Sequence, residues 1–464
     1  MTATRPAVTG HGPAAADAPE PAARRHLLPA GADIDPFTLA GDHGILWADG
    51  GRILVGLGVA RQIALPGGLA GTEGIDRAQT NLGSIDCDDL VPPGTTALRP
   101  VLAFGALPFD RTAPASLVVP ETLYCREPGG AEWVTVVSGR YDDGPAISGA
   151  GLRDRLVATA AAHRVGDTRP VGTRVLPHSS DGAYEEAVAC AVAAIGRGEL
   201  SKVVLARRVD VALDRDPDVG SLLRRWCSLE PNCTLFSLPT TAGQFVGASP
   251  ELLVERTADH VRSRPLAGTT DRFPDAGSML PPALLDSAKD TEEHRFVVDA
   301  IGQALEPWCT YLDVPDHPEL VHLHNLTHLG TTVEGTLRHG DHRPLPGALH
   351  LAALLHPTPA VGGVPRVPAL RLIEQLEDGP RGSYAGPVGY VDGAGDGRFV
   401  VGIRAMTVAG RTATLTAGVG VVAGSVPETE RIEASLKFAA VFDALAPGVP
   451  FTTAGAADRL EEYT

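Results

Sequence analysis

The sequence contains no run of apolar residues long enough to cross a membrane, which takes about 18 or more. Its first forty residues hold alanine, proline and glycine but lack the apolar core of a secretory signal. The six cysteines are scattered without a CxxC pair, which argues against zinc, redox and disulfide-framework roles. These absences indicate a protein of the reducing cytoplasm that neither spans a membrane nor is secreted.

Positive charge is also scarce. Lys and Arg total 39 against 56 Asp and Glu, which gives a formal net charge of −17. A surface of that sign repels nucleic-acid backbones and anionic membranes, so we expect neither as a partner. An anionic small molecule remains possible where cations gather locally. Hydrophobic residues at 44% and charged residues at 20% are typical of a globular protein.

The hydrophobic pattern divides the chain into four parts. Residues 1–28 are rich in alanine and proline without periodicity, which predicts a disordered tail. Residues 29–180 contain short apolar runs separated by turn residues, so we expect a β-rich N-terminal part. Strands alternate with helices over residues 181–447, the expected catalytic region, and 448–464 form a second tail. The pattern predicts an α+β fold with mainly antiparallel strands.

Two predicted helices each begin with a pair of carboxylates three residues apart. In SAKDTEEHRFVV the expected cap is Ser287, and in GSVPETERIEASLKF it is Ser425. The pairs are Asp290 with Glu293, and Glu430 with Glu433. Each pair alone is explained by acidic side chains that stabilise a helix N-terminus. Two such pairs facing each other would instead supply hard oxygen ligands for magnesium.

Other polar residues lie in apolar surroundings that leave their roles open. Arg404 lies in GRFVVGIRAMTV, which we interpret as one strand apolar on both faces, so Arg404 needs a buried anion, structural or bound. Lys202 begins the strand SKVVLARR and in isolation is expected at the surface. Glu251 follows a turn and in isolation simply starts a strand. His328 and His356 are individually expected as core or loop histidines.

Taken together, these segments resemble the chorismate-utilising enzymes that share the anthranilate-synthase large-subunit fold. The matching segments, over roughly residues 180–445, are SKVVLARR, GASPELLVER, RPLAGTT, SAKDTEEH, HNLTHLGTTVEG, LLHPTPAVGGVP, RGSYAGPVGY, VGIRAM and AGVGVVAGSVPETERIEASLKF. The resemblance implies a large, mainly antiparallel β-sandwich-like core flanked by helices. It also implies a site between the two halves of that core.

The resemblance implies a role for each candidate residue. Lys202 matches a general base for water and Glu251 an acid for a departing hydroxyl, so the lysine must become neutral and the carboxyl must be protonated. Mg²⁺ would be bound directly by Glu293 and Glu433, and through water by Asp290 and Glu430. The residues that match substrate-binding positions are Gly268, Thr269, His328, Tyr384, Arg404, Gly418 and Lys437.

Within the family, the motifs are similar to those of isochorismate synthases, which exchange the C4 hydroxyl of chorismate for one at C2. Ammonia-using members have glutamine at the position of Lys202, so no glutaminase subunit is expected. Lyase members carry threonine at the position of Ala360. A salicylate synthase, which goes on to eliminate pyruvate, is the alternative, and an inactive homologue is another. Siderophore and menaquinone pathways both stay open, with the siderophore favoured by overall resemblance, and a monomer is expected.

Overall fold

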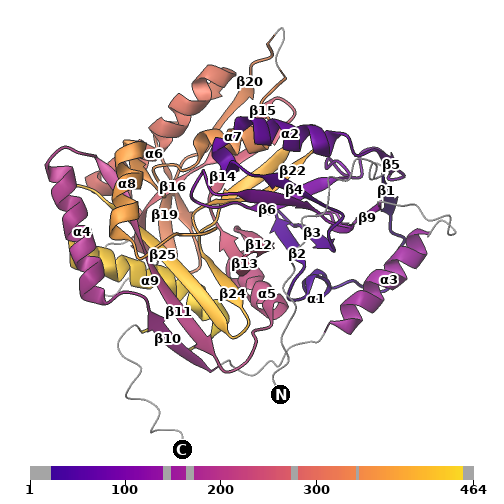
Figure 1. Ribbon diagram of the computed structural model, residues 1–464, viewed down its shortest axis with the longest axis horizontal. Coiled ribbons are helices and arrows are strands. Elements are labelled where there is room, and N and C mark those ends of the chain that lie inside the picture. Colours follow the sequence, from indigo (N-terminus) through magenta and orange to yellow (C-terminus); the bar gives the residue numbers. More distant parts are fainter. Residues whose placement is uncertain (1–21, 139–147, 164–171, 273–280, 341–343, 453–464) are drawn as a thin grey trace, which may run out of the picture.

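The structure is a computed structural model that describes residues 22–138, 148–163, 172–272, 281–340 and 344–452. Two large sheets dominate it and helices flank them (Figure 1). In this described part of the chain, every pair of neighbouring strands is antiparallel except the pair β1 (Ala22–Leu27) and β5 (Cys87–Asp89). The predicted α+β fold with a mainly antiparallel, sandwich-like core is confirmed.

Within the described residues, the larger sheet has 13 strands. In spatial order they are β10 (Thr173–Pro177), β11 (Lys202–Leu213), β25 (Thr412–Val421), β24 (Ala405–Ala409), β13 (Gly243–Ser249), β12 (Thr234–Thr240), β2 (Ile45–Asp49), β3 (Arg52–Leu57), β8 (Thr122–Arg126), β9 (Glu132–Ser138), β1 and β5, with β21 (Gly363–Val364) beside β11.

The second sheet has nine strands, and a third has three. The nine are β17 (Cys309–Asp313), β20 (Val333–Leu337), β15 (His260–Arg264), β14 (Leu252–Thr257), β23 (Gly397–Val401), β22 (Pro387–Asp392), β6 (Leu102–Ala106), β7 (Ala115–Val119) and β4 (Arg61–Leu65). The three are β16 (Leu266–Asp271), β19 (Leu326–Gly330) and β18 (Glu319–His322).

Helices cover the outer faces and ends of the sheets. They are α1 (Pro36–Ala40), α2 (Thr72–Gly83), α3 (Gly149–Ala162), α4 (Asp181–Gly196), α5 (Val219–Leu229), α6 (Ala288–Leu305), α7 (Ala348–Leu355), α8 (Arg366–Leu376) and α9 (Pro427–Leu445), with short 3₁₀ turns η1 (Gly68–Ala70), η2 (Pro281–Leu284) and η3 (Glu306–Trp308). Figure 1 shows α4 and α9 side by side next to β11 and β25, and α6 packs on β16 and β19.

An aromatic layer fills the space between the two large sheets. Trp47 and Phe236 from the larger sheet are buried against Phe104 and Tyr390 from the nine-stranded sheet, in one apolar cluster. The rings of Trp47 and Tyr390 meet edge to face at 5.5 Å between centroids, a favourable aromatic geometry. The sandwich is therefore held by alternate inward-facing side chains of both sheets.

Two strands change sheets at neighbouring points. β13 ends in the larger sheet and, after two intervening residues, β14 begins in the nine-stranded sheet, while β23 and β24 make the reverse change. The crossovers are bonded together, since Val401 N–H donates to Glu251 O at 3.0 Å and Ser249 Oγ donates to Val401 O at 2.6 Å. The single strand predicted around Arg404 is therefore wrong, because the chain leaves the ladder at Gly402 and Arg404 has a φ of 51°.

The boundary predicted for the N-terminal tail is wrong over residues 22–27. These residues form β1, which pairs with β9 and β5, while residues 1–21 lie outside the described part. Arg25 is 5% exposed, stacks on Trp133 and forms an ion pair with Asp89. The segment AARRHL carries no apolar alternation, so tertiary pairing rather than pattern makes it a strand.

The boundary predicted for the C-terminal tail, 448–464, is wrong at its beginning, because Phe451 packs on α9. Residues 448–452 are described, and the Phe451 ring packs against Phe438 at 5.3 Å and Phe442 at 5.4 Å between centroids. Residues 453–464 lie outside the described part. In addition, all six cysteines are free thiols, and among described residues no helix is long and apolar enough to cross a membrane.

Of the two serines predicted to cap helices, Ser287 does so and Ser425 does not. Ser287 caps α6 as predicted, with its hydroxyl accepting from Asp290 N–H and donating to the Asp290 carboxylate. Ser425 does not cap α9, because Val426 occupies the cap position and the Ser425 hydroxyl accepts from Val422 N–H instead. Pro427 explains the shift, since proline is favoured as the first helical residue.

We predict that Arg25→Met lowers the free energy of unfolding by about 1–3 kcal/mol, because it removes the buried guanidinium together with its ion pair and hydrogen bonds. Arg24→Met is the matched control on the same strand, since Arg24 and Asp88 are partly exposed and such pairs contribute about 0.2–1 kcal/mol. Denaturant unfolding measures both. Equal, small effects would contradict the docking of β1.

Candidate active site

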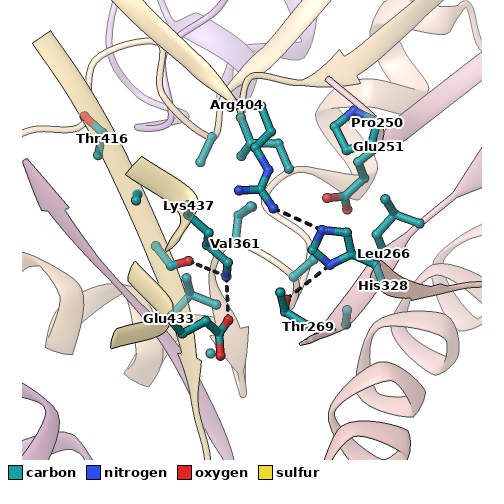
Figure 2. A pocket seen from close by; sticks show the side chains of 18 of the residues that line it. Pro250, Glu251, Leu266, Thr269, His328, Val361, Arg404, Thr416, Glu433 and Lys437 are labelled. Carbon is teal, nitrogen blue, oxygen red and sulfur yellow. Dashed lines mark hydrogen bonds and ion pairs between the residues drawn. The ribbon is translucent and has the colours of Figure 1, made fainter. Parts of the chain in front are cut away.

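One pocket lies where the crossovers meet β11, β25, β16, β19, α6 and α9. Its lining includes most of the predicted site residues, namely Glu251, Gly268, Thr269, Glu293, His328, Tyr384, Arg404, Gly418, Glu433 and Lys437. Figure 2 shows Glu251 and His328 on one side of it and Lys437 with Glu433 on the other, with Arg404 between them. The other predicted residues, Lys202, Asp290 and Glu430, do not line this pocket. Lys202 contacts the lining residue Glu293, and Asp290 lies next to the lining residue Gly268. Glu430 is paired with Lys289 of α6.

Lys202 is fully buried, so the surface location expected for it in isolation is wrong. As the first residue of β11 it is covered by β21, where it pairs with Val364, and by α6, where Glu293 approaches it. Its Nζ lies 2.9 Å from Glu293 Oε1, but among described residues it makes no aligned hydrogen bond. The contact is therefore a charge pair that leaves the amine donors unused.

Glu251 lies at the first crossover and is 2% exposed. Burial raises the pKa of its carboxyl to about 8, although the Lys202 charge and a hydrogen bond from the Leu266 backbone act in the opposite direction. The carboxyl is consequently protonated at neutral pH. It can act as a general acid toward a group in the pocket.

Arg404 and His328 form a hydrogen-bonded pair at the second crossover. Arg404 Nη2 donates to His328 Nε2 at 3.0 Å, so Nε2 is an acceptor and Nδ1 carries the proton that faces Gly268 O at 3.0 Å. Burial and then the nearby Arg404 charge hold the pKa of His328 well below its ordinary value, which keeps the ring neutral. Arg404 Nη1 is buried and, among described residues, has no hydrogen-bond partner. A bound anion would satisfy it.

Lys437 and Gly418 form the opposite wall. The Lys437 ammonium lies 2.7 Å from Glu433 Oε1 and donates to Gly418 O at 2.9 Å. A Cβ on Gly418 would lie 3.1 Å from the Tyr384 hydroxyl, so glycine lets this backbone approach the ring. Gly420 was missed from the sequence, although a Cβ there would lie 2.1 Å from Glu293 Oε1. Glycine inside a strand is the signal that could have indicated it.

The four predicted metal-binding carboxylates lie in the first two turns of α6 and α9. Burial and then the Glu293 charge raise the pKa of Asp290, and burial and then the Glu433 charge raise the pKa of Glu430. Each glutamate is paired with a lysine: Glu293 with Lys202 at 2.9 Å, Glu430 with Lys289 at 2.9 Å, and Glu433 with Lys437 at 2.7 Å. In this arrangement no group of three or more His, Cys, Asp or Glu among described residues is gathered closely enough to hold a metal.

The donor set nevertheless fits a hard divalent cation. All its atoms are carboxylate oxygens, which Mg²⁺ prefers, and the carboxylates repel one another. Glu430 Oε2 is buried without a hydrogen-bond partner in the described part of the chain, which leaves a ligand oxygen available. The carboxylates would exchange lysine contacts for metal or metal-bound water.

A second buried pair shapes the pocket wall and was also missed. Arg381 is paired with Glu377 and donates to the carbonyls of Val361 at 2.7 Å and Val204 at 2.8 Å. This fixes the segment with Ala360 against β11. His356 lies outside the pocket, is 1% exposed and contacts Phe109 O at 2.9 Å through Nε2, which confirms its expected core position.

Comparison with known proteins identifies the class. The chain matches the model of the family described as chorismate binding enzyme over residues 49–446, and it therefore belongs to that family. The family resemblance inferred from the motifs is confirmed.

Individual relatives of the chain carry the name isochorismate synthase. The chain is 40% identical over 374 residues to the putative isochorismate synthase MenF of Mycobacterium tuberculosis, covering 77% of this chain and 90% of the relative. It is 36% identical over 353 residues to the isochorismate synthase DhbC of Bacillus subtilis, covering 74% and 80%. The crystal structure of a putative 2,3-dihydroxybenzoate-specific isochorismate synthase, DhbC from Bacillus anthracis, aligns with a TM-score of 0.70 at 30% identity, covering 88% and 96%.

We predict that kcat/KM falls with rising pH around a midpoint near pH 8, because the raised pKa of Glu251 means that its proton is lost only there. Glu251→Gln keeps the side-chain shape and should lower turnover by about 10²–10⁴-fold while removing this alkaline limb. Steady-state kinetics across the pH range measure both. An unchanged alkaline limb in Glu251→Gln would assign the titration to another group.

Proposed function

We propose that the protein is an isochorismate synthase, which converts chorismate to isochorismate by adding water at C2 and expelling the C4 hydroxyl. Relatives named for this activity support it. The observation that carries it is that a buried carboxyl, Glu251, lines the pocket, while a buried amine, Lys202, lies behind the pocket wall at 2.9 Å from the lining residue Glu293. Exchange of hydroxyls at two ring carbons needs one base and one acid at separate positions.

Lys202 is the proposed base and Glu251 the proposed acid. In its neutral form Lys202 accepts a proton from water while the water oxygen bonds to C2. The two ring double bonds shift together, from C1=C2 and C5=C6 to C1=C6 and C4=C5, as the C4–O bond breaks. Glu251 donates its proton to the departing hydroxyl, which leaves as water. The Glu251 proton is available at neutral pH because burial raises the pKa of that carboxyl to about 8.

The cationic side of the pocket is proposed to hold the substrate carboxylates. Arg404 Nη1 is buried and unpartnered among described residues, so a carboxylate there would replace the missing acceptor. Lys437 and the Gly418 backbone would bind with it, next to the Tyr384 hydroxyl. Both ring nitrogens of His328 are engaged by protein groups, so His328 acts on substrate by orienting Arg404.

Gly268 and Thr269 are the remaining residues proposed to bind substrate, and they line the pocket close to Asp290. Gly268 has a φ of 68°, and a Cβ there would lie 3.0 Å from the Asp290 Cβ, so glycine brings β16 close to α6. Thr269 Oγ1 lies 3.1 Å from His328 Nδ1. The two residues would place substrate between His328 and the carboxylates.

Mg²⁺ is the proposed cofactor, bound directly by Glu293 and Glu433 and through water by Asp290 and Glu430. When bound it would offset the charge of a substrate carboxylate and orient it. We further propose a cytoplasmic monomer without a glutaminase subunit, working in 2,3-dihydroxybenzoate siderophore synthesis. Relatives named MenF and relatives named DhbC both match, so the relatives' names do not decide between the two pathways. The functions of the genes that neighbour this one would test the pathway.

We predict that purified protein with chorismate and Mg²⁺ forms a mixture of chorismate and isochorismate, because Lys202 selects water and Ala360 stands in the pocket wall where lyases carry threonine. Chromatography of the products measures this. Salicylate with equal pyruvate would make the protein a salicylate synthase, and anthranilate from ammonium salts would contradict the role of Lys202.

We also predict an order among the carboxylates. Glu293→Gln and Glu433→Gln should weaken Mg²⁺ binding by more than about 100-fold, whereas Asp290→Asn and Glu430→Gln should weaken it by about 10-fold, since water can replace a water-bridged ligand in part. Calorimetric titration of Mg²⁺ measures all four. Equal, mild losses would mean that these acids only stabilise helix N-termini.

A further inference from the structure

Lysine is rare in this protein and is confined to one place. The 464 residues include 39 Lys and Arg, of which only Lys202, Lys289 and Lys437 are lysine. Each of the three forms an ion pair with a different glutamate of the candidate metal site. A compact ammonium differs from a planar guanidinium in how it meets oxygen ligands, so confinement of lysine to these positions indicates a need for that group. The proposed function uses Lys202 and Lys437 but leaves Lys289 unassigned.

Lys289 occupies a position that is unfavourable for a cation in an isolated helix. It lies in the first turn of α6, where the helix dipole favours negative charge. Its Nζ lies 2.9 Å from Glu430 Oε1, and the Glu430 residue is 0% exposed. Lys289 therefore links α6 to a carboxylate of α9.

We propose that Lys289 is an internal counter-ion of the metal site, which neutralises Glu430 when no divalent cation is bound and competes with the cation for that carboxylate. This proposal rests on the proposed function, in which Glu430 binds Mg²⁺ through water. An ammonium donates hydrogen bonds to carboxylate oxygens as a metal-bound water does, so the two can exchange at Glu430.

Two consequences follow from the burial of Glu430. Without Lys289, the metal-free protein would keep a buried carboxylate with no cation, which is strongly destabilising. With Lys289, a divalent cation must displace or approach a positive charge, which weakens its binding. Lys289 thus stabilises the metal-free site and weakens Mg²⁺ binding. The fraction of sites that hold Mg²⁺ therefore depends on the free Mg²⁺ concentration.

The experiment is a calorimetric titration of Mg²⁺ into the wild-type protein and Lys289→Met, with thermal unfolding of each measured with and without the metal. Lys289→Met should bind Mg²⁺ about tenfold more tightly, by removal of one nearby charge. It should also melt at a lower temperature without Mg²⁺ and recover with it. Arg295→Met is the matched control, because Arg295 is an exposed cation on the same helix and should leave both measurements unchanged.

The outcomes separate this proposal from the proposed function. Absence of Mg²⁺ binding to the wild-type protein would contradict the metal site itself. Wild-type binding with equal affinity in Lys289→Met would overturn only the counter-ion. If Lys289→Met folds only with Mg²⁺, the proposal is supported. If it folds in neither condition, Lys289→Arg carries the test: a guanidinium that binds both oxygens of Glu430 should weaken Mg²⁺ binding, and unchanged binding would overturn the proposal.

Discussion

The site depends on one constraint of the fold, the exchange of two strands between the large sheets. Where β13 becomes β14 and β23 becomes β24, the chain belongs to neither sheet, and Glu251 and Arg404 lie at these two points. The crossovers bond to each other at Val401, the last residue of β23. The Glu251 and Arg404 side chains therefore line one pocket, and the burial of Glu251 strengthens the electrostatic effects that act on its carboxyl.

Cations gather in the pocket although the molecule as a whole is strongly acidic. The protein carries a formal charge of −17, yet its pocket is lined by Arg404 and Lys437, with Lys202 directly behind. The partly exposed carboxylates of Glu293 and Glu433 pair with these lysines, and the Arg404 Nη1 atom is left for an anion. Burial thus determines which groups are charged, because it keeps Glu251 protonated and His328 neutral.

The sequence motifs identified residues that meet in one pocket, but they did not indicate all the strand and helix boundaries around those residues. The capping box at Ser287 was predicted because its signal is local, whereas Pro427 shifted the start of α9 past Ser425. Burial of Lys202 was not predictable from its strand, because β21 and α6 come from distant segments to cover it. The break before Arg404 was missed because GRFVVGIRAMTV is apolar throughout and only the tertiary change of sheet divides it.

The central claim is that a water activated by Lys202 enters at one ring carbon while the hydroxyl protonated by Glu251 leaves from another. Turnover of chorismate in ¹⁸O-labelled water, followed by mass spectrometry of the isochorismate formed, tests this most directly. The account predicts one ¹⁸O atom in the new C2 hydroxyl of the first product molecules. Isochorismate without label would mean that the hydroxyl moves within the substrate, and would contradict the account.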